Sequence, residues 1–326
     1  MVRIRIATNL DECEILWRRA VPQETISDLW EVRSCFQRHF NRPTYFVVAE
    51  EHGEVVGLLP LSWVEETGSY AYFPGETWQG KTWLEQNRII ARDENVRRKL
   101  VAHVPSPYSL RYLLVDEPPG SSHIVDEVGY LFYPGAYNHD METYFGQFSH
   151  KSAKRIRKEI AAIEQYGVEY RYNDIDDFEH LVHLNVSRFG EESYFFDGRF
   201  RESFRSLMHF LREQGWLRLT TVIIDGEPAA VDMGCVYNGT YTLLAGGTNG
   251  RFPGVAKLIN LHHMQRACNE KIPQVDFLCG NFSWKTMFHL APRPLYAISS
   301  VPMDAQPPVV IQPQSVAKSR SAVHVA

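Results

Sequence analysis

The sequence predicts an α/β protein made of two tandem units. Hairpin patterns turn at His52-Gly53 and at Asp225-Gly226, one in each half of the chain. A helical pattern and then a strand follow each hairpin, at 95–104 and 110–115 in the first half and at 255–270 and 275–278 in the second. This order indicates a duplicated unit, although few residues are identical.

Size and composition fit a soluble globular protein. The chain has 326 residues, enough for two domains, with 44% hydrophobic and 22% charged residues. A net charge of −5 and a pI near 6.2 argue against a dedicated nucleic-acid binder, so DNA is not an expected partner. We find no apolar run of membrane-spanning length and no signal-peptide core, and the five scattered cysteines fit reduced thiols. We therefore expect a cytoplasmic protein without an integral membrane segment.

The first half carries these elements in order. A strand at 1–7 precedes helices at 11–20 and 25–40, the second opened by a Thr25/Asp28 capping box. The first hairpin covers 45–63, and the helix and strand named above follow it. We expect this half to end at residue 145, which defines a first domain over 1–145.

The second half begins with a strongly basic helix at 149–166. A strand at 168–172, helices at 174–189 and 199–214, and the second hairpin at 217–237 come next. A strand at 241–245, the helix from 255, the strand from 275, a short helix at 284–290 and a strand at 295–301 complete a domain over 146–303. Residues 304–326 are rich in proline, glutamine and serine, and we predict a disordered tail.

The most informative stretch is the joint between strand 241–245 and the following helix. It reads Arg-x-x-Gly-x-Ala over residues 251–256. Free N–H groups of a first helical turn carry partial positive charge and bind phosphates. Gly254 and Ala256 would let a diphosphate approach the main chain, and Arg251 adds a charged donor. The alternative is that these small residues only end a strand, but the strands on both sides favour anion binding.

The order of elements in the second half resembles motif A of the GNAT acyltransferases. This order is a hairpin, a strand, a helix that begins with Arg-x-x-Gly-x-Ala, and another strand. Over residues 1–302 the pattern is similar to the CelD/BcsL group, a double-GNAT arrangement related to the FemABX peptidyltransferases. Its clearest stretches are 225–229, 251–254 and 275–285. The resemblance implies an α+β fold of two tandem GNAT-like domains, each a mixed, largely antiparallel sheet flanked by helices. The first domain lacks Arg-x-x-Gly-x-Ala and is expected to be degenerate.

The resemblance also implies a site for acetyl-CoA or another acyl-CoA as co-substrate. The pyrophosphate would lie on amides 251–256, and the pantetheine arm in a gap where the strands at Leu243 and Phe277 separate. No third ligand stands at metal spacing near His180 and His183 or near His262 and His263, so we expect no metal. The cofactor-binding candidates are Leu243, Ala245, Arg251, Phe252, Gly254, Val255, Ala256 and Lys257.

Three residues are candidates for catalysis, because amine attack on a thioester needs a base and donors facing the oxyanion. Asp232 interrupts an apolar strand and is either a buried base or a carboxylate that faces solvent or pairs with an arginine. Asp276 either points toward the ligand cleft or forms an ion pair at a strand edge. Lys285 either binds an anion or oxyanion, or is a solvated lysine.

Fewer residues point to the binding site of the acceptor substrate. The resembled family commonly has Tyr-Lys where this chain has Trp284-Lys285, and an indole cannot protonate a leaving thiolate. Trp284 is therefore expected to contact the acyl chain or acceptor. By the resemblance, Arg188 and Glu192 face the acceptor cleft. Lys151 and Arg155 of the basic helix either bind an anionic ligand, such as a nucleotide-sugar diphosphate, the CoA 3′-phosphate or tRNA, or are simply solvated.

Three functions follow from these observations. The first is acyl transfer from acyl-CoA to an amine of a small metabolite, sugar or amino-acid derivative, by direct attack in a ternary complex. The second is a FemX-like transferase that uses aminoacyl-tRNA in cell-envelope synthesis. The third is a non-catalytic GNAT-like scaffold in polysaccharide biosynthesis, which the Trp284 departure makes credible.

Overall fold

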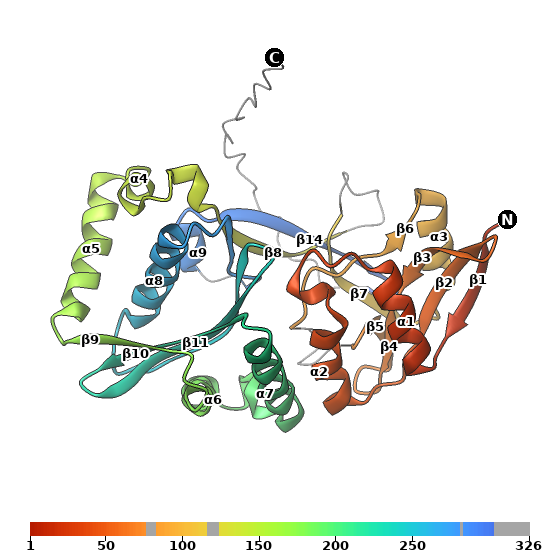
Figure 1. Ribbon diagram of the computed structural model, residues 1–326, viewed down its shortest axis with the longest axis horizontal. Coiled ribbons are helices and arrows are strands. Elements are labelled where there is room, and N and C mark those ends of the chain that lie inside the picture. The colour runs from red at the N-terminus through yellow and green to blue at the C-terminus, as the bar shows by residue number, and fades with distance from the viewer. Residues whose placement is uncertain (76–82, 116–123, 281–282, 303–326) are drawn as a thin grey trace, which may run out of the picture.

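The computed structural model describes residues 1–302 except 76–82, 116–123 and 281–282 (Figure 1). A ten-stranded sheet runs through both halves of the chain, and a four-stranded sheet lies at the N-terminal end. The small sheet has the order β1 (Arg3–Ala7), β2 (Phe46–Glu51), β3 (Glu54–Leu59) and β6 (Ile90–Ala91). The large sheet has the order β4 (Leu61–Val64), β5 (Ser69–Tyr72), β7 (Tyr108–Leu113), β14 (Ala291–Ser299), β8 (Ile124–Phe132), β13 (Gln274–Asp276), β12 (Thr240–Thr248), β11 (Glu227–Tyr237), β10 (Leu217–Ile224) and β9 (Val168–Tyr172).

Helices cover both faces of the large sheet (Figure 1). In the C-terminal half, α6 (Asp177–Phe189) and α7 (Gly198–Glu213) cover one face, while α5 (His150–Glu164) and α8 (Val255–Asn269) cover the other. The remaining helices are α1 (Leu10–Ala20), α2 (Trp30–Phe40), α3 (Glu94–Ala102), α4 (Met141–Phe145) and α9 (Ser283–Met287). Within the described residues, no helix combines the length and apolar character that crossing a bilayer requires.

Most strand pairs are antiparallel, as predicted. The exceptions are β12 with β13 and β5 with β7, which pair in parallel. The predicted fold class, a mixed and largely antiparallel sheet flanked by helices, is therefore confirmed. The two hairpins turn where their sequences predict, with positive φ at His52 and Gly53 and at Asp225 and Gly226.

The two halves exchange strands at the centre of the large sheet. β8 comes from the N-terminal half but pairs with β13, and β14, the last strand, lies between β7 and β8. The halves are therefore joined by main-chain hydrogen bonds, and the sheet runs through the predicted boundary at residue 145, which stays a prediction. The sequence analysis assigned no strand at β8, whose segment carries Asp126 and Glu127 among its apolar residues.

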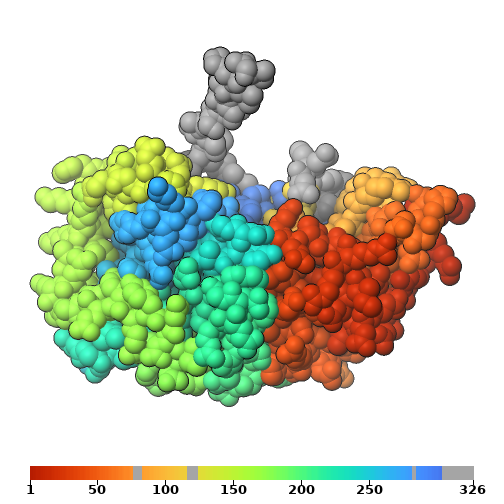
Figure 2. Space-filling view, viewed as in Figure 1, coloured from red at the N-terminus to blue at the C-terminus, as the bar shows by residue number. Residues whose placement is uncertain are grey.

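Helices also pack across the two halves. α2 lies against α7, where the Phe36 ring is 5.9 Å from the Phe200 ring and 5.8 Å from the Phe204 ring. On the face drawn in Figure 2, the red N-terminal part and the green part around α7 meet directly. This contact adds an aromatic layer to the joint made by the exchanged strands.

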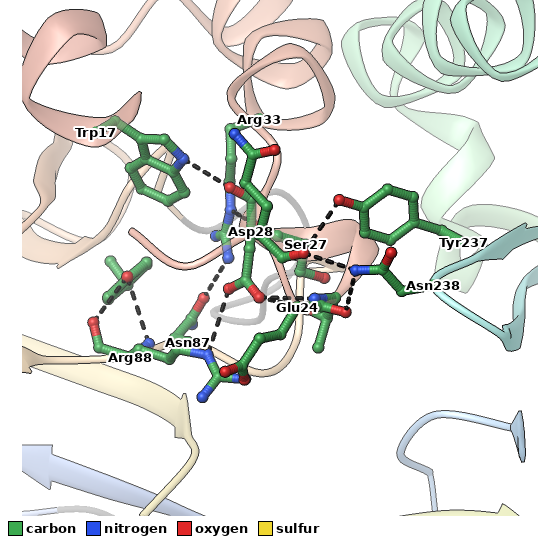
Figure 3. Close-up of polar contacts among 12 residues, drawn as sticks. Trp17, Glu24, Ser27, Asp28, Arg33, Asn87, Arg88, Tyr237 and Asn238 are labelled. Carbon is green, nitrogen blue, oxygen red and sulfur yellow. Dashed lines mark hydrogen bonds and ion pairs between the residues drawn. The ribbon is translucent and has the colours of Figure 1, made fainter. Parts of the chain in front are cut away.

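A buried arginine explains why the predicted helix at 25–40 is interrupted. Residues Ile26–Asp28 form a 3-10 turn closed by the Thr25/Asp28 capping box, and α2 begins only at Trp30. The Trp17 indole donates to the Asp28 carbonyl (2.7 Å), and the Arg33 guanidinium donates to the Ser27 carbonyl (2.7 Å), so these carbonyls are not available to a helix (Figure 3).

The same cluster reaches the other half of the chain. Arg33 also donates to the Phe73 carbonyl (2.7 Å) and to Asn87 Oδ1 (2.8 Å). Asn238, in the turn between β11 and β12, donates to the carbonyls of Gln23 (2.7 Å) and Glu24 (3.3 Å) (Figure 3). Arg33 is only 1% exposed, so its charge is stabilised by these acceptors rather than by water.

We predict that Arg33→Met lowers the free energy of unfolding by about 3–5 kcal/mol, because it leaves three buried acceptors without a donor. Urea unfolding followed by tryptophan fluorescence measures the change. Arg38→Met, on the exposed side of the same helix, is the matched control and should change stability by less than about 0.5 kcal/mol. Equal effects of the two substitutions would contradict the role assigned to Arg33.

Candidate functional site

The site is built where β12 and β13 separate. The two strands pair only through residues 240–242 and 274–276. The register between β11 and β12 shifts at Leu244, since Met233 lies opposite Ala245 while Gly234 lies opposite Leu243. Such a bulge bends a strand, so β12 turns away from the line of β13. The expected separation of the strands at Leu243 and Phe277 is therefore present.

The N-terminal half contacts the gap between these strands, and the predicted place of the pantetheine arm there stays a prediction. A segment of the N-terminal half, residues 83–86, contacts both strands. The Trp83 indole donates to the Leu244 carbonyl (2.5 Å), the Glu85 carboxylate accepts from the Cys279 N–H (2.9 Å), and Gln86 donates to Asp276 (2.7 Å). Diverging strands leave main-chain groups unpaired, and Trp83 and Glu85 pair two of these groups.

The N-terminus of α8 keeps two free N–H groups. Arg251 N–H donates to Asn249 Oδ1, Phe252 N–H to the Asn249 carbonyl, and Val255 N–H to the Phe252 carbonyl. Among the described residues, the N–H groups of Gly254 and Ala256 have no acceptor. No side chain caps the helix, and its first turn holds no acidic residue. Two of the predicted amide donors are thus available to an anion, and three are already used.

Arg251 and Lys257 both have carboxylate partners. The exposed Arg251 side chain forms an ion pair with Glu227 (2.7 Å), and Lys257 forms one with Glu159 of α5. Ile163 of α5 lies on Gly254, where a Cβ would come within 2.9 Å of the Ile163 Cδ1 atom. Gly254 also has φ +91°, so glycine is needed there for two reasons.

Asp232 lies beneath α8 and is only 4% exposed. Its Oδ2 atom is 2.9 Å from His263 Nε2, and His263 Nδ1 is 3.3 Å from the Tyr241 hydroxyl. A Cβ at Gly246 would lie 2.3 Å from Asp232 Oδ1, so a larger residue does not fit opposite it. Asp232 is buried and, in the part of the chain that the structure describes, pairs with His263 and not with an arginine, which corrects that alternative. Its predicted role as a base stays a prediction.

Asp276 and Lys285 are both buried at the joint between the halves. Asp276 accepts from Arg293 of β14 (2.8 Å), from Gln86 and from the Leu278 N–H (2.9 Å), so its ion pair lies within the sheet rather than at an edge. Lys285 is 2% exposed, which corrects the expectation of a solvated lysine. Its ammonium donates to the carbonyls of Phe277 (2.9 Å), Leu278 (2.9 Å) and Cys279 (2.6 Å), so its three N–H bonds already have acceptors.

Glu85 is a candidate that the sequence analysis missed. It is 8% exposed, and burial raises the pKa of its carboxyl to about 7. Within the described residues it forms no ion pair, whereas Asp276 has Arg293. It lies in a segment without helical or strand periodicity, so no local pattern marked it.

The acceptor candidates are spread over the C-terminal half. Trp284 packs edge-on against Phe277 (5.4 Å) and Phe288 (5.6 Å) in an apolar cluster. Arg188 donates to Thr248 Oγ1 (2.5 Å) at the end of β12. Glu192 is exposed in the 3-10 turn that follows α6. Lys151 and Arg155 are exposed on α5, where Arg155 reaches Met287 Sδ of α9 (3.7 Å).

Residues 150–286 match the family model of the acetyltransferase (GNAT) domain. Over this part, the chain is similar to GNAT acetyltransferase domains. The match covers the whole split between β12 and β13, both helices α5 and α8, and nearly every candidate site residue. The finer resemblance to the CelD/BcsL group stays a prediction. A comparison with curated proteins found no match.

Solved structures extend the likeness to both halves. A conserved protein of unknown function from Bacteroides thetaiotaomicron has a TM-score of 0.55 at 14% identity, covering 91% of this chain and 98% of that one. FemX has a TM-score of 0.54 at 9% identity, covering 90% and 97%. A tandem GNAT protein from the clavulanic acid biosynthesis pathway has a TM-score of 0.51 at 12% identity, covering 93% and 100%. At these identities the likeness shows a tandem GNAT fold.

The pKa of Glu85 predicts a pH-dependent stability. When the pKa of an acid rises on folding, ionisation of that acid lowers the free energy of unfolding. For Glu85 this loss of stability is absent below about pH 4.5 and complete above about pH 7. Glu85→Gln should therefore stabilise the fold by about 3 kcal/mol at pH 8 and by almost nothing at pH 4.5. Thermal unfolding of both proteins from pH 4.5 to 8 measures the difference, and a difference independent of pH would refute the assignment.

Proposed function

We propose that this protein is an acyl-CoA-dependent N-acyltransferase whose GNAT domain binds the cofactor phosphates at the N-terminus of α8. The observation that carries the proposal is the pair of free N–H groups at Gly254 and Ala256, in a helix start without a capping side chain or an acidic residue. Such a start is an anion site, because dipole and donors both favour negative charge. The GNAT family match covers this helix.

Two cationic side chains beside the start of α8, Arg251 and Lys257, can bind the cofactor phosphates. The Arg251–Glu227 pair is 71% and 50% exposed, and exposed pairs contribute only about 0–1 kcal/mol, so Arg251 can exchange Glu227 for a phosphate at little cost. Lys257 stands in the first turn of α8 beside Glu159, and it would contact the phosphates from there. The proposed cofactor site therefore consists of Arg251, Lys257 and the two free amides.

The donor would be acetyl-CoA or another acyl-CoA, and the acceptor an amine on a small metabolite, sugar or amino-acid derivative. Direct attack in a ternary complex is favoured over a cysteine relay. Burial raises the pKa of the described thiols, to about 11 for Cys13, Cys35 and Cys268, to about 12 for Cys235, and well above its usual value for Cys279. Thiols that are hard to ionise are poor nucleophiles.

A second candidate, a FemX-like transfer from aminoacyl-tRNA, is favoured by α5. Lys151, Lys154 and Lys158 are exposed along one stripe of this helix. Lys151 stands in the first turn of the helix, where the dipole disfavours positive charge, so its charge does not serve helix stability. Binding of tRNA that weakens steeply with salt and is lost in a Lys151→Glu, Lys154→Glu variant would support this candidate over acyl-CoA.

We predict that Ala256→Glu abolishes most acetyl-CoA binding without harming the fold. A carboxylate in the first turn of a helix repels phosphates yet interacts favourably with the dipole. Acetyl-CoA should bind the wild-type protein with heat measurable by calorimetry, and Ala256→Glu should weaken that binding at least tenfold.

The matched control is Ala256→Gln, which has the same size without the charge and should bind within about threefold of wild type. Melting temperatures of the two variants test whether the fold is intact. Wild-type protein that binds no acetyl-CoA, or a glutamate variant that binds as well as the glutamine variant, would refute the proposed cofactor site.

A further inference from the structure

We infer that Glu85, supplied by the N-terminal half, is the base that takes the proton from the acceptor amine. The inference rests on the proposed acyl transfer and adds to it a residue from outside the GNAT family match, which begins at residue 150.

The proposed phosphate site and Trp83 lie on opposite faces of the sheet. α8 covers one face, and its N-terminus is the proposed phosphate site (Figure 1). Trp83 packs on the other face, with its ring 4.1 Å from that of Tyr194 and 5.8 Å from that of Phe200, next to α7. A thioester that enters the split from the α8 face therefore meets residues 83–86 from the far side, where an attacking amine would stand.

Glu85 has the position and the chemistry for a base in that place. Its carboxylate accepts from the Cys279 N–H at 3.1 and 2.9 Å, just beyond the end of β13. The other candidate carboxylates are engaged, Asp232 with His263 and Asp276 with Arg293. Burial holds the pKa of Glu85 at about 7, which suits proton transfer near neutral pH.

Charged and titratable groups surround Glu85 on every side. Cys279 and Asp276 belong to β13 and its exit, Lys285 to α9, Arg293 to β14 and Tyr112 to β7. Asp276 opposes ionisation of Glu85 and Lys285 favours it. Lys285 donates to three carbonyls, and Asp276 forms an ion pair with Arg293. Of these three residues, Glu85 is therefore the one able to change its protonation state during turnover.

The step balances as follows. The acceptor nitrogen attacks the thioester carbonyl carbon, forming the C–N bond, and the C–S bond breaks. The proton lost from nitrogen goes to the Glu85 carboxylate, and sulfur leaves as the CoA thiolate, which takes a proton from water. Glu85 then returns its proton to solvent.

The test uses the full chain with acetyl-CoA and, as acceptors, glucosamine, lysine and spermidine, with thiol release followed from pH 5.5 to 9. Glu85→Gln should lower kcat at least 100-fold, leave KM for acetyl-CoA within about twofold, and remove the rise of rate through pH 7. Glu85→Asp, which keeps a shortened carboxylate, should retain a measurable part of the activity and of that pH profile. Glu65→Gln, at an exposed position, is the control for removing a carboxylate and should match wild type.

A purely structural Glu85 gives a different result. Glutamine keeps an acceptor for the Cys279 N–H, so a melting temperature at pH 8 equal to or above wild type excludes unfolding as the cause of lost activity. Activity within fivefold of wild type, or an unchanged pH profile, overturns the inference. Wild-type protein that binds acetyl-CoA but acylates none of the three amines also overturns it, whereas wild-type protein that binds no acetyl-CoA refutes the proposed function itself.

Discussion

The separation of β12 and β13 is the constraint on which the rest of the structure depends. Two parallel strands that part after three residue pairs leave main-chain groups without partners in the middle of a ten-stranded sheet. Unpaired buried groups of this kind cost about 1–3 kcal/mol each, so they must be satisfied from elsewhere. Here the side chains of Trp83 and Glu85 satisfy Leu244 and Cys279, and Lys285 satisfies three carbonyls at the end of β13.

These side-chain contacts join the two halves of the chain. Residues 83–86 belong to the N-terminal half, Asp276 and Lys285 to the C-terminal half, and Arg293 lies on the strand that returns between β7 and β8. Breaking a buried ion pair by removing one partner costs about 3–5 kcal/mol. The Gln86 amide joins the N-terminal half to this buried ion pair, so the position of the halves is tied to charges that cannot be separated cheaply.

Helix α5 contacts the proposed cofactor site through two side chains. Its Ile163 side chain packs on Gly254, and its Glu159 carboxylate neutralises Lys257 in the first turn of α8. The helix thus supplies the negative charge that the start of α8 lacks in its own sequence. Its exposed Lys151 and Lys154 stand nearer the other end of the same helix, so one element carries both a contact with the proposed cofactor site and a positive surface.

The sequence by itself determined the local elements. Turn residues at His52-Gly53 and Asp225-Gly226 set both hairpins, and the glycine at 254 followed by an apolar period set the start of α8. Only the tertiary structure decided which side chains share the site. The contact between Glu85 and Cys279 spans 194 residues, and the one between Gln86 and Asp276 spans 190. Periodicity reports only the neighbours of a residue along the chain. Burial, pKa and pairing depend on neighbours that folding brings from distant parts of the sequence. For this reason, the burial of Lys285 and the place of Glu85 at the site were not predictable from the sequence.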